Sequence, residues 1–211
     1  MKKFLIIDDH EIVRSGVKNV LLELFKPAEI YEANDEKTAL PLLKERDYDL
    51  VIMDVQMPET DTAGLMEYIR TRYAGTKVLI FSMSPENVYA KRFLKNGAMG
   101  FVSKNAGLTV LRKAIDMVLN NRKYISENLA EQLASDIGET KEEIPFDKLS
   151  SREFEIVSLL VKGKSVTEIS DLLAINTSTV GTHKSRSFEK LNVKNLAELI
   201  EISRIYNINN G

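Results

Sequence analysis

The sequence predicts an α/β domain built on a doubly wound, five-stranded parallel sheet, followed by a smaller all-α domain. Five short apolar runs alternate with five helical patterns over about the first 120 residues, and this alternation is typical of a parallel sheet with helices on both faces. Four of these runs end on or next to a charged or hydroxyl side chain. Beyond residue 148 no strand pattern recurs, and four short helices are expected.

The composition fits a globular protein of one large or two small domains. The chain has 211 residues, of which 44% are apolar and 28% charged, which is ordinary for a soluble protein. No run approaches the roughly 18 apolar residues of a membrane span, and no signal-like segment opens the chain. The absence of cysteine excludes a disulfide framework and a thiol catalyst. We therefore expect a cytoplasmic protein without a membrane partner.

The strands are predicted from continuous apolar runs, because parallel strands are buried on both faces. The run Leu50–Met53 ends on Asp54, and Pro58 closes it because proline cannot donate to a ladder. The run Phe4–Ile7 likewise ends on Asp8 and Asp9. Strands are expected at residues 4–7, 29–33, 50–53, 78–82 and 100–104.

Apolar residues three or four positions apart predict a helix after each strand. Asp35 is expected to cap the second helix. The predicted helices include residues 12–24, 35–43, 65–73, 86–96 and 108–119. In the flavodoxin-like order the first and third strands are neighbours at the centre of the sheet, so Asp8 and Asp9 should lie beside Asp54.

The chain is expected to divide at a polar segment. Residues 126–137 could form an amphipathic helix, and residues 139–145 are acidic and end in proline, which is typical of a linker. The predicted organisation is a first domain over 1–122, a linker over 123–147 and a second domain over 148–211.

Four helices are expected in the second domain. Ser150 and Glu153 are spaced for a capping box, and Gly163 ends this first helix. The others are predicted at 166–174, 177–191 and 195–206, with a tight turn at Ile175-Asn176. About 60 residues in this arrangement are too few for an enzyme core.

The polar residues at the strand ends predict a phosphoryl-transfer site. Three carboxylates at one sheet edge repel one another unless a cation intervenes, and oxygen ligands with several waters suit Mg²⁺. A carboxylate such as Asp54 can also form an aspartyl phosphate. Ser82 and Lys104 would supply the hydroxyl and the ammonium that a phosphoryl group needs. The alternative is structural: Lys104 neutralises the aspartates and Ser82 caps a helix.

These residues resemble the receiver domain of two-component response regulators, which has the CheY-like form of the flavodoxin-like fold. The resemblance covers about residues 1–120 and implies that a sensor histidine kinase phosphorylates Asp54. It implies an Mg²⁺ site formed by Asp9, Asp54 and the backbone carbonyl of Gln56, with Asp8 acting through water.

The resemblance also implies a switch. Lys104 would contact the phosphoryl group, Ser82 would move toward it, and the ring of Phe101 would rotate into the space that the hydroxyl leaves. An ordinary core phenylalanine on a buried strand is the alternative for Phe101. Asn105 stands where many receivers have proline, which affects the peptide after the lysine and not the chemistry.

The second domain resembles the LuxR-type helix-turn-helix. Residues 176–194 carry four cations and one anion, which alone would indicate only a solvated charged face. The resemblance rests on the order of residues in three stretches over about 146–208: Leu149-Ser150-Ser151-Arg152-Glu153, residues 163–170, and Thr179-Val180-Gly181-Thr182-His183 with Lys190-Leu191.

This resemblance implies that residues 177–191 enter the major groove of double-stranded DNA. The predicted DNA-binding residues are Thr179, Thr182, His183, Lys184, Arg186 and Lys190. Thr182 would read bases, and the lysines and Arg186 would contact phosphates. Gly181 replaces a common basic residue and Ser187 a usual aliphatic one, so we expect modest affinity for isolated sites and greater dependence on dimerisation.

The dimer face of the second domain is predicted on its last helix. Leu196, Leu199 and Ile200 are the candidates, and core packing explains the leucines equally well. Together these features predict a NarL/FixJ-type response regulator that is a homodimer when phosphorylated and is not an enzyme. The alternatives are a constitutive DNA-binding regulator whose receiver is only a dimerisation module, and a phosphatase or phosphotransferase that turns over through Asp54.

Overall fold

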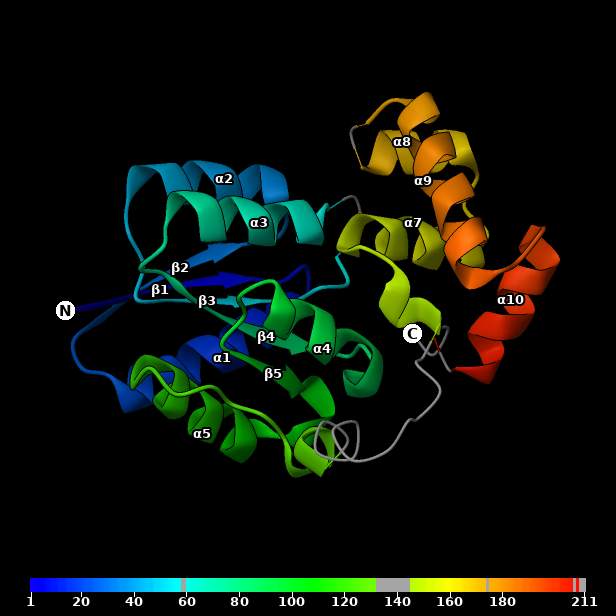
Figure 1. Cartoon of the computed structure of the whole chain (residues 1–211). Coiled ribbons are helices and arrows are strands. Elements are labelled where there is room, and N and C mark those ends of the chain that lie inside the picture. Colours follow the sequence, from blue (N-terminus) through cyan, green and yellow to red (C-terminus); the bar gives the residue numbers. More distant parts are fainter. Residues whose placement is uncertain (58–59, 132–144, 174, 207, 209–211) are drawn as a thin grey trace. The chain divides into compact units, whose positions relative to one another are not determined.

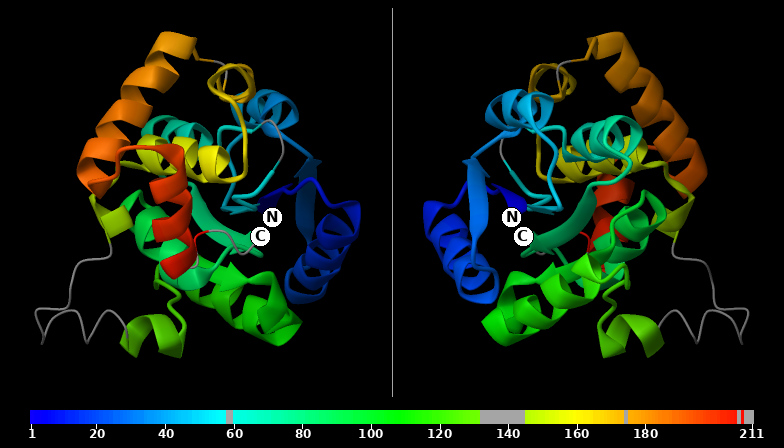
Figure 2. Two further views of the ribbon diagram at one scale, coloured as in Figure 1. Left: turned by 90° about the vertical axis from the view of Figure 1, so that its right-hand side faces the viewer. Right: turned by 90° about the vertical axis from the view of Figure 1, so that its left-hand side faces the viewer.

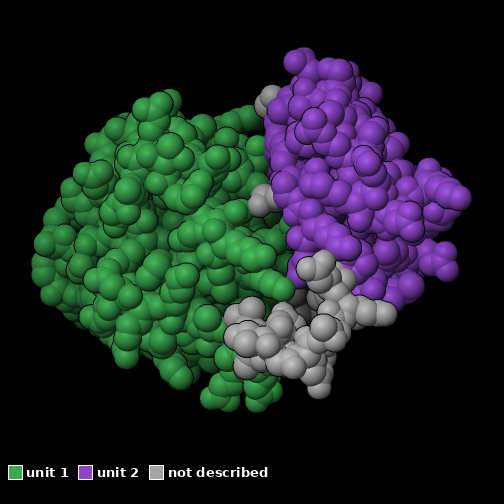
Figure 3. Space-filling model, viewed as in Figure 1, with its two compact units in different colours: residues 1–133 green, residues 134–211 purple. Residues whose placement is uncertain are grey.

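A computed structural model of the chain describes residues 1–57, 60–131, 145–173, 175–206 and 208 (Figure 1). The chain forms two compact units, residues 1–133 and residues 134–211 (Figure 3). The linker predicted over 123–147 stays a prediction: residues 127–131 are helical, and the remainder of the expected helix, 132–137, lies outside the described residues.

The first unit is a five-stranded parallel sheet of the predicted flavodoxin-like type, with strand order β2-β1-β3-β4-β5. Its strands are β1 (Lys2–Ile7), β2 (Ala28–Ala33), β3 (Leu50–Met53), β4 (Lys77–Ser82) and β5 (Gly100–Ser103). Its helices are α1 (Glu11–Leu24), α2 (Glu36–Glu45), α3 (Thr62–Arg72), α4 (Glu86–Lys95) and α5 (Leu108–Leu119), with a 3₁₀ turn η1 (Lys104–Ala106) after β5. The doubly wound prediction is confirmed.

The strands are buried on both faces, as their continuous apolar runs predict. Phe4 and Ile6 of β1 belong to a core cluster with α1 and α5, while the intervening Leu5 and Ile7 are also fully buried. Helices α1 and α5 cover one face of the sheet, and α2 and α3 cover the other (Figures 1 and 2). The helices thus cover the two faces of the sheet and leave the carboxyl ends of the central strands between these two layers.

Helix starts in the first unit follow local chemistry. The Asp35 side chain accepts a hydrogen bond from the Thr38 N–H at 2.7 Å and completes a capping box at α2, as predicted for this aspartate. His10 precedes α1 without any side-chain cap, so its imidazole is not needed to begin the helix.

The second unit consists of short helices packed on one another. They are η2 (Pro145–Lys148), α7 (Ser151–Val161), α8 (Val166–Leu172), α9 (Thr177–Leu191) and α10 (Leu196–Ile205). Ser150 and Glu153 form the predicted capping box, and Gly163 follows α7 with a φ of +84°, a conformation that glycine adopts without strain. Ile156, Ile169, Val180 and Leu199 are each fully buried.

Candidate functional site

The carboxylates of the first unit gather where β1 and β3 end. These strands pair in parallel, with Ile7 opposite Met53, and the Asp54 N–H donates to the Ile7 carbonyl at 2.9 Å. Asp8 and Asp54 are 2% and 3% exposed, whereas the Asp9 side chain is 27% exposed. Two anions are thus buried side by side at the sheet edge, and each requires a partner.

Lys104 supplies that partner. It follows β5, its side chain is only 8% exposed, and its Nζ lies 2.5 Å from Asp54 Oδ2 and 2.7 Å from Asp8 Oδ2. Burial raises the pKa of Asp8 in spite of the opposing hydrogen bonds from Lys104 and the His10 backbone. Burial also disfavours the charged form of Lys104, but its hydrogen bonds to Asp54 and Asp8 outweigh this and raise the pKa of the lysine. Lys104 is therefore an ammonium at neutral pH.

A hydroxyl meets the other oxygen of Asp54. Ser82, the last residue of β4, is fully buried and donates from Oγ to Asp54 Oδ1 at 2.5 Å. The Gln56 backbone N–H donates to the same oxygen at 3.0 Å. Ser84, which the sequence did not single out, lies behind Ser82 with its Oγ 3.2 Å from the Ser82 Oγ. Both oxygens of Asp54 are therefore bound by groups that could equally bind an attached phosphoryl oxygen.

Phe101 lies in the core of the same sheet. It pairs with Ile80 across β4 and β5 and is fully buried. It precedes Lys104 by three residues on the chain, so β5 and η1 connect the core to the charged site. Both alternatives for Phe101, a core residue and a switch, are compatible with this position.

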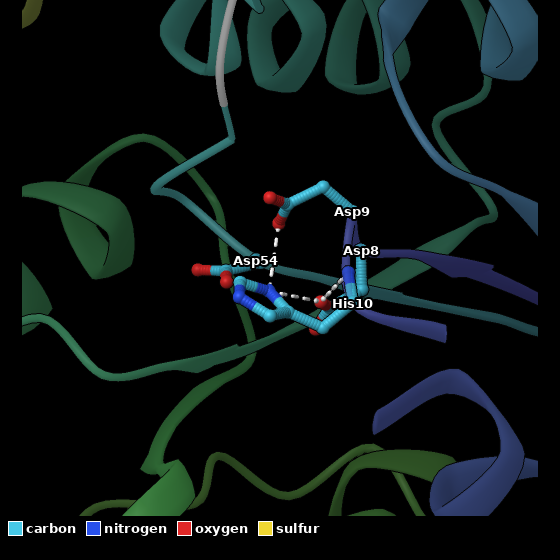
Figure 4. Close-up of side chains that lie close together, drawn as sticks. All are labelled: Asp8, Asp9, His10 and Asp54. Atoms are coloured by element: carbon cyan, nitrogen blue, oxygen red, sulfur yellow. Dashed lines mark hydrogen bonds and ion pairs between the residues drawn. The ribbon is translucent and has the colours of Figure 1, made fainter. Parts of the chain in front are cut away.

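His10 joins the cluster, which the sequence reasoning missed. Its Nδ1 lies 2.9 Å from Asp9 Oδ1 and 3.4 Å from Asp8 Oδ1 (Figure 4). One ligand atom from each of Asp8, Asp9, His10 and Asp54 lies within 4.8 Å of the others, close enough to bind one divalent cation. Three carboxylates fit a hard cation such as Mg²⁺. The signal in the sequence was a histidine directly after a strand-terminal aspartate pair.

In the second unit, α8 ends at Leu172 and α9 begins at Thr177 (Figure 1). Helix α9 spans Thr177–Leu191, the predicted range, and buries Val180, Ser187 and Leu191 on its inner side. Its exposed residues include Thr182 and Arg186.

The predicted DNA-binding residues of α9 differ in their exposure to solvent. Thr182 and Arg186 are exposed, and Thr179, His183 and Lys184 are half-buried. The Thr182 hydroxyl donates to the Ser178 carbonyl at 2.9 Å, and Lys184 Nζ lies 5.4 Å from the centre of the Phe188 ring.

Lys190 has a partner inside its unit. Its Nζ lies 2.6 Å from Oε2 of Glu153, a residue that is 3% exposed and also forms the capping box of α7. Burial acts to raise the pKa of Glu153, but hydrogen bonds from Lys190 and Ser150 outweigh it and lower the pKa. This contact links α7 to α9, a structural role that the sequence reasoning did not assign to Lys190.

The residues proposed for a dimer face also differ in their exposure to solvent. Leu199 is fully buried, Leu196 is 39% exposed and Ile200 is half-buried. The position of Leu199 favours core packing, and Leu196 and Ile200 remain accessible on α10.

Each of the two units matches a known protein family. Residues 4–116 match the response regulator receiver domain, and residues 147–203 match the luxR family of bacterial regulatory proteins. The chain is 32% identical over 204 residues to the response regulator UvrY of Escherichia coli K12, which covers 96% of this chain and 94% of UvrY. Among the described helices, none is long and apolar enough to cross a membrane.

Two solved structures of RcsB are similar to the chain. One is RcsB of Salmonella enterica serovar Typhimurium bound to promoter rprA with the phosphomimetic BeF₃⁻, with a TM-score of 0.74 and 26% identity over 95% of this chain and 97% of that one. The other contains two RcsB dimers bound to two parallel DNAs, with a TM-score of 0.60 and 25% identity over 96% of this chain and 98% of that one.

Proposed function

Because the chain belongs to the NarL/FixJ family of response regulators, with a receiver domain and a LuxR-type DNA-binding domain, we propose that phosphorylation of Asp54 controls its dimerisation and sequence-specific DNA binding. A sensor histidine kinase supplies the phosphoryl group. The family consists of transcription regulators, and the proposed output is regulated transcription, which requires the protein to act in the cytoplasm where the chromosome lies.

The contacts of Asp54 carry this proposal. Its carboxylate is 3% exposed, with Lys104 on one oxygen and Ser82 on the other. Phosphoryl transfer depends mainly on positioning and on stabilising charge, and an ammonium with a hydroxyl provides both.

The transfer balances simply. One oxygen of Asp54 attacks the phosphorus of a phosphohistidine, the N–P bond breaks, and the imidazole leaves with the bonding pair and takes a proton. Asp9, Asp54 and the Gln56 carbonyl would bind Mg²⁺, with Asp8 acting through water. When bound, the cation neutralises charge on the phosphoryl oxygens.

Lys104 and Ser82 then become the contacts of the phosphoryl group. Both already bind Asp54. Each must therefore move to contact the phosphoryl oxygens when the group is added, and this movement would shift the ends of β4 and β5. Phe101, buried on β5, is the proposed aromatic partner of the switch. Phosphorylation thus biases a receiver surface between two states.

The DNA-binding proposal rests on α9 and on the RcsB complexes. Helix α9 would enter the major groove, with Thr182 and Arg186 on its exposed side and Thr179, His183 and Lys184 beside them. One RcsB structure contains promoter DNA, and the other contains dimers bound to DNA, which supports paired half-sites here. Lys190, bound to Glu153, would reach phosphate only by leaving that contact. Leu196 and Ile200 are the accessible part of the proposed dimer face.

The test is the intact mass of the chain after incubation with Mg²⁺ and a small-molecule phosphodonor. We expect one added phosphoryl group on the wild type and on Asp116→Asn, whose side chain is 64% exposed, and none on Asp54→Asn. Absence of an adduct on the folded wild type would contradict phosphoryl control and favour the constitutive regulator. Repeated turnover of the donor with no stable adduct would favour a phosphatase.

A further inference from the structure

The imidazole of His10 lies against the carboxylates of the acidic cluster, with Nδ1 facing Asp9 Oδ1 and Asp8 Oδ1 (Figure 4). We propose that His10 Nδ1 is a ligand of the cation bound here, and that the site consequently binds a first-row transition ion such as Mn²⁺ in preference to Mg²⁺. This rests on the proposed cation site, and it adds a nitrogen ligand and an ion preference to it.

The spacing of the donors fits a shared ion. Two neighbouring ligands of an octahedral ion, with bonds of about 2.1 Å at right angles, are about 3.0 Å apart. The separation of Asp9 Oδ1 from His10 Nδ1 is 2.9 Å. An N–H···O hydrogen bond has the same length, so the distance permits ligation and the experiment below distinguishes the two.

The oxygens facing His10 are those that Lys104 leaves free. Lys104 Nζ binds Asp8 Oδ2 and Asp54 Oδ2, and Ser82 binds Asp54 Oδ1. Asp8 Oδ1 and Asp9 Oδ1 are on the His10 side of the cluster. A cation there would have carboxylate and imidazole donors together.

That donor set determines the preference for an ion. Mg²⁺ selects oxygen ligands and retains water, whereas imidazole suits first-row transition metals, and Mn²⁺ also accepts carboxylates. Adding one imidazole therefore strengthens the binding of Mn²⁺ more than that of Mg²⁺.

The backbone makes His10→Ala a clean variant. The His10 N–H donates to Asp8 Oδ1 at 2.9 Å, and its carbonyl accepts from the Arg14 N–H at 3.1 Å. Both hydrogen bonds survive in alanine, and the side chain does not cap α1. The chain has two histidines, so His183→Ala on α9 is a matched control.

The experiment loads the full chain with Mn²⁺ alone and records electron spin-echo envelope modulation, which detects a ligated nitrogen. We expect nitrogen coupling in the wild type and His183→Ala, and none in His10→Ala. Loss of even an outer-shell partner of a metal ligand typically costs about 10–100-fold in metal affinity, so losing the imidazole itself should weaken Mn²⁺ binding about tenfold or more and Mg²⁺ binding by less. Nitrogen coupling that persists in His10→Ala, its absence from the wild type, or failure of Mn²⁺ to bind would each overturn the inference.

Its failure is distinct from failure of the proposed function. A wild type that is phosphorylated on Asp54 but shows no nitrogen coupling overturns the ligand role of His10 and leaves phosphoryl control standing. Nitrogen coupling lost in His10→Ala, in a chain that takes no phosphoryl group, supports the ligand and removes the phosphoryl switch.

Discussion

Lys104 holds two buried anions together, so its removal should be costly. Lys104→Met leaves Asp8 and Asp54 buried without their ammonium, and breaking a buried pair typically costs about 3–5 kcal/mol. We expect a loss of about 3 kcal/mol in the free energy of unfolding, measured with urea at neutral pH in the presence of a chelator. A divalent cation should recover part of this loss, because it neutralises the same two carboxylates that Lys104 neutralises in the wild type.

Lys2→Met is the matched control for Lys104→Met. Lys2 pairs with Asp49 at 2.7 Å, but the two side chains are 46% and 32% exposed, and exposed pairs contribute about 0–1 kcal/mol. If both variants lose the same small amount, Lys104 does not stabilise the buried carboxylates. That result would leave its role to phosphoryl contact alone.

At this scale the sequence predicts side-chain chemistry better than side-chain partners. Asp8, Asp54, Ser82 and Lys104 follow apolar runs whose carboxyl ends must meet in a parallel sheet, so their meeting can be anticipated. The turn of His10 toward Asp9, and the placement of Ser84 behind Ser82, depend on backbone angles beyond the strand ends. No periodicity encodes those angles.

Between elements, the contact of Lys190 with Glu153 joins α9 to α7. Because Lys190 is 40% exposed, solvent screens the pair, and Lys190→Met should cost about 1–2 kcal/mol, chiefly from leaving the buried Glu153 uncompensated. The pKa of Glu153 is lowered from its ordinary 4.5, so its contribution is present above pH 4.5 and is lost as the pH falls below it. The difference in the free energy of unfolding between the wild type and Lys190→Met, measured with urea, should therefore shrink as the pH falls below 4.5.

Lys164→Met provides the comparison, since Lys164 pairs with Glu168 on the surface at side-chain exposures of 44% and 52%. Such an exposed pair, screened by solvent, contributes little to stability. A Lys190→Met variant as stable as Lys164→Met, with weakened DNA binding, would instead show that Lys190 serves as a phosphate contact.

Another prediction concerns Glu86, which begins α4 and accepts a hydrogen bond from Ser126 at 2.8 Å. Burial raises the pKa of Glu86, against the effect of this hydrogen bond. A raised carboxyl pKa means that stability falls as the pH rises from the ordinary value of 4.5 through the folded pKa. We therefore expect Glu86→Gln, which can still accept from Ser126, to be the more stable protein at neutral pH and equal to the wild type below pH 4.5. Glu127 is exposed, so the control Glu127→Gln should leave the stability unchanged both at neutral pH and below pH 4.5.

Element boundaries followed from short-range chemistry. The Asp35 and Ser150 caps begin α2 and α7, and α9 covers the predicted range 177–191, because capping and helical periodicity act within a few residues. The link between α7 and α9 was not predicted, since it joins residues 37 positions apart.

For the whole molecule, the family pairs a receiver with a LuxR-type DNA-binding domain, and the control proposed here passes through assembly of two copies. Two copies of α9 related by a two-fold axis reach successive major grooves only when half-site centres are about 10–10.5 base pairs, or a multiple, apart. Gly181 stands where a basic residue is common and so leaves fewer cations on α9, and each missing phosphate contact lowers the affinity of a single domain. A dimer compensates by binding twice.

We therefore expect duplexes selected by the phosphorylated chain from a random pool to contain paired half-sites. Inserting five base pairs between them turns one half-site to the opposite side of the helix, because that is about half a helical turn. Fluorescence anisotropy at fixed salt should show at least about a tenfold loss of affinity. Asp54→Asn should bind the original and the spaced duplex equally weakly. Equal binding of both duplexes by the phosphorylated chain would mean that one domain suffices, and that phosphorylation does not act through a two-fold dimer on DNA.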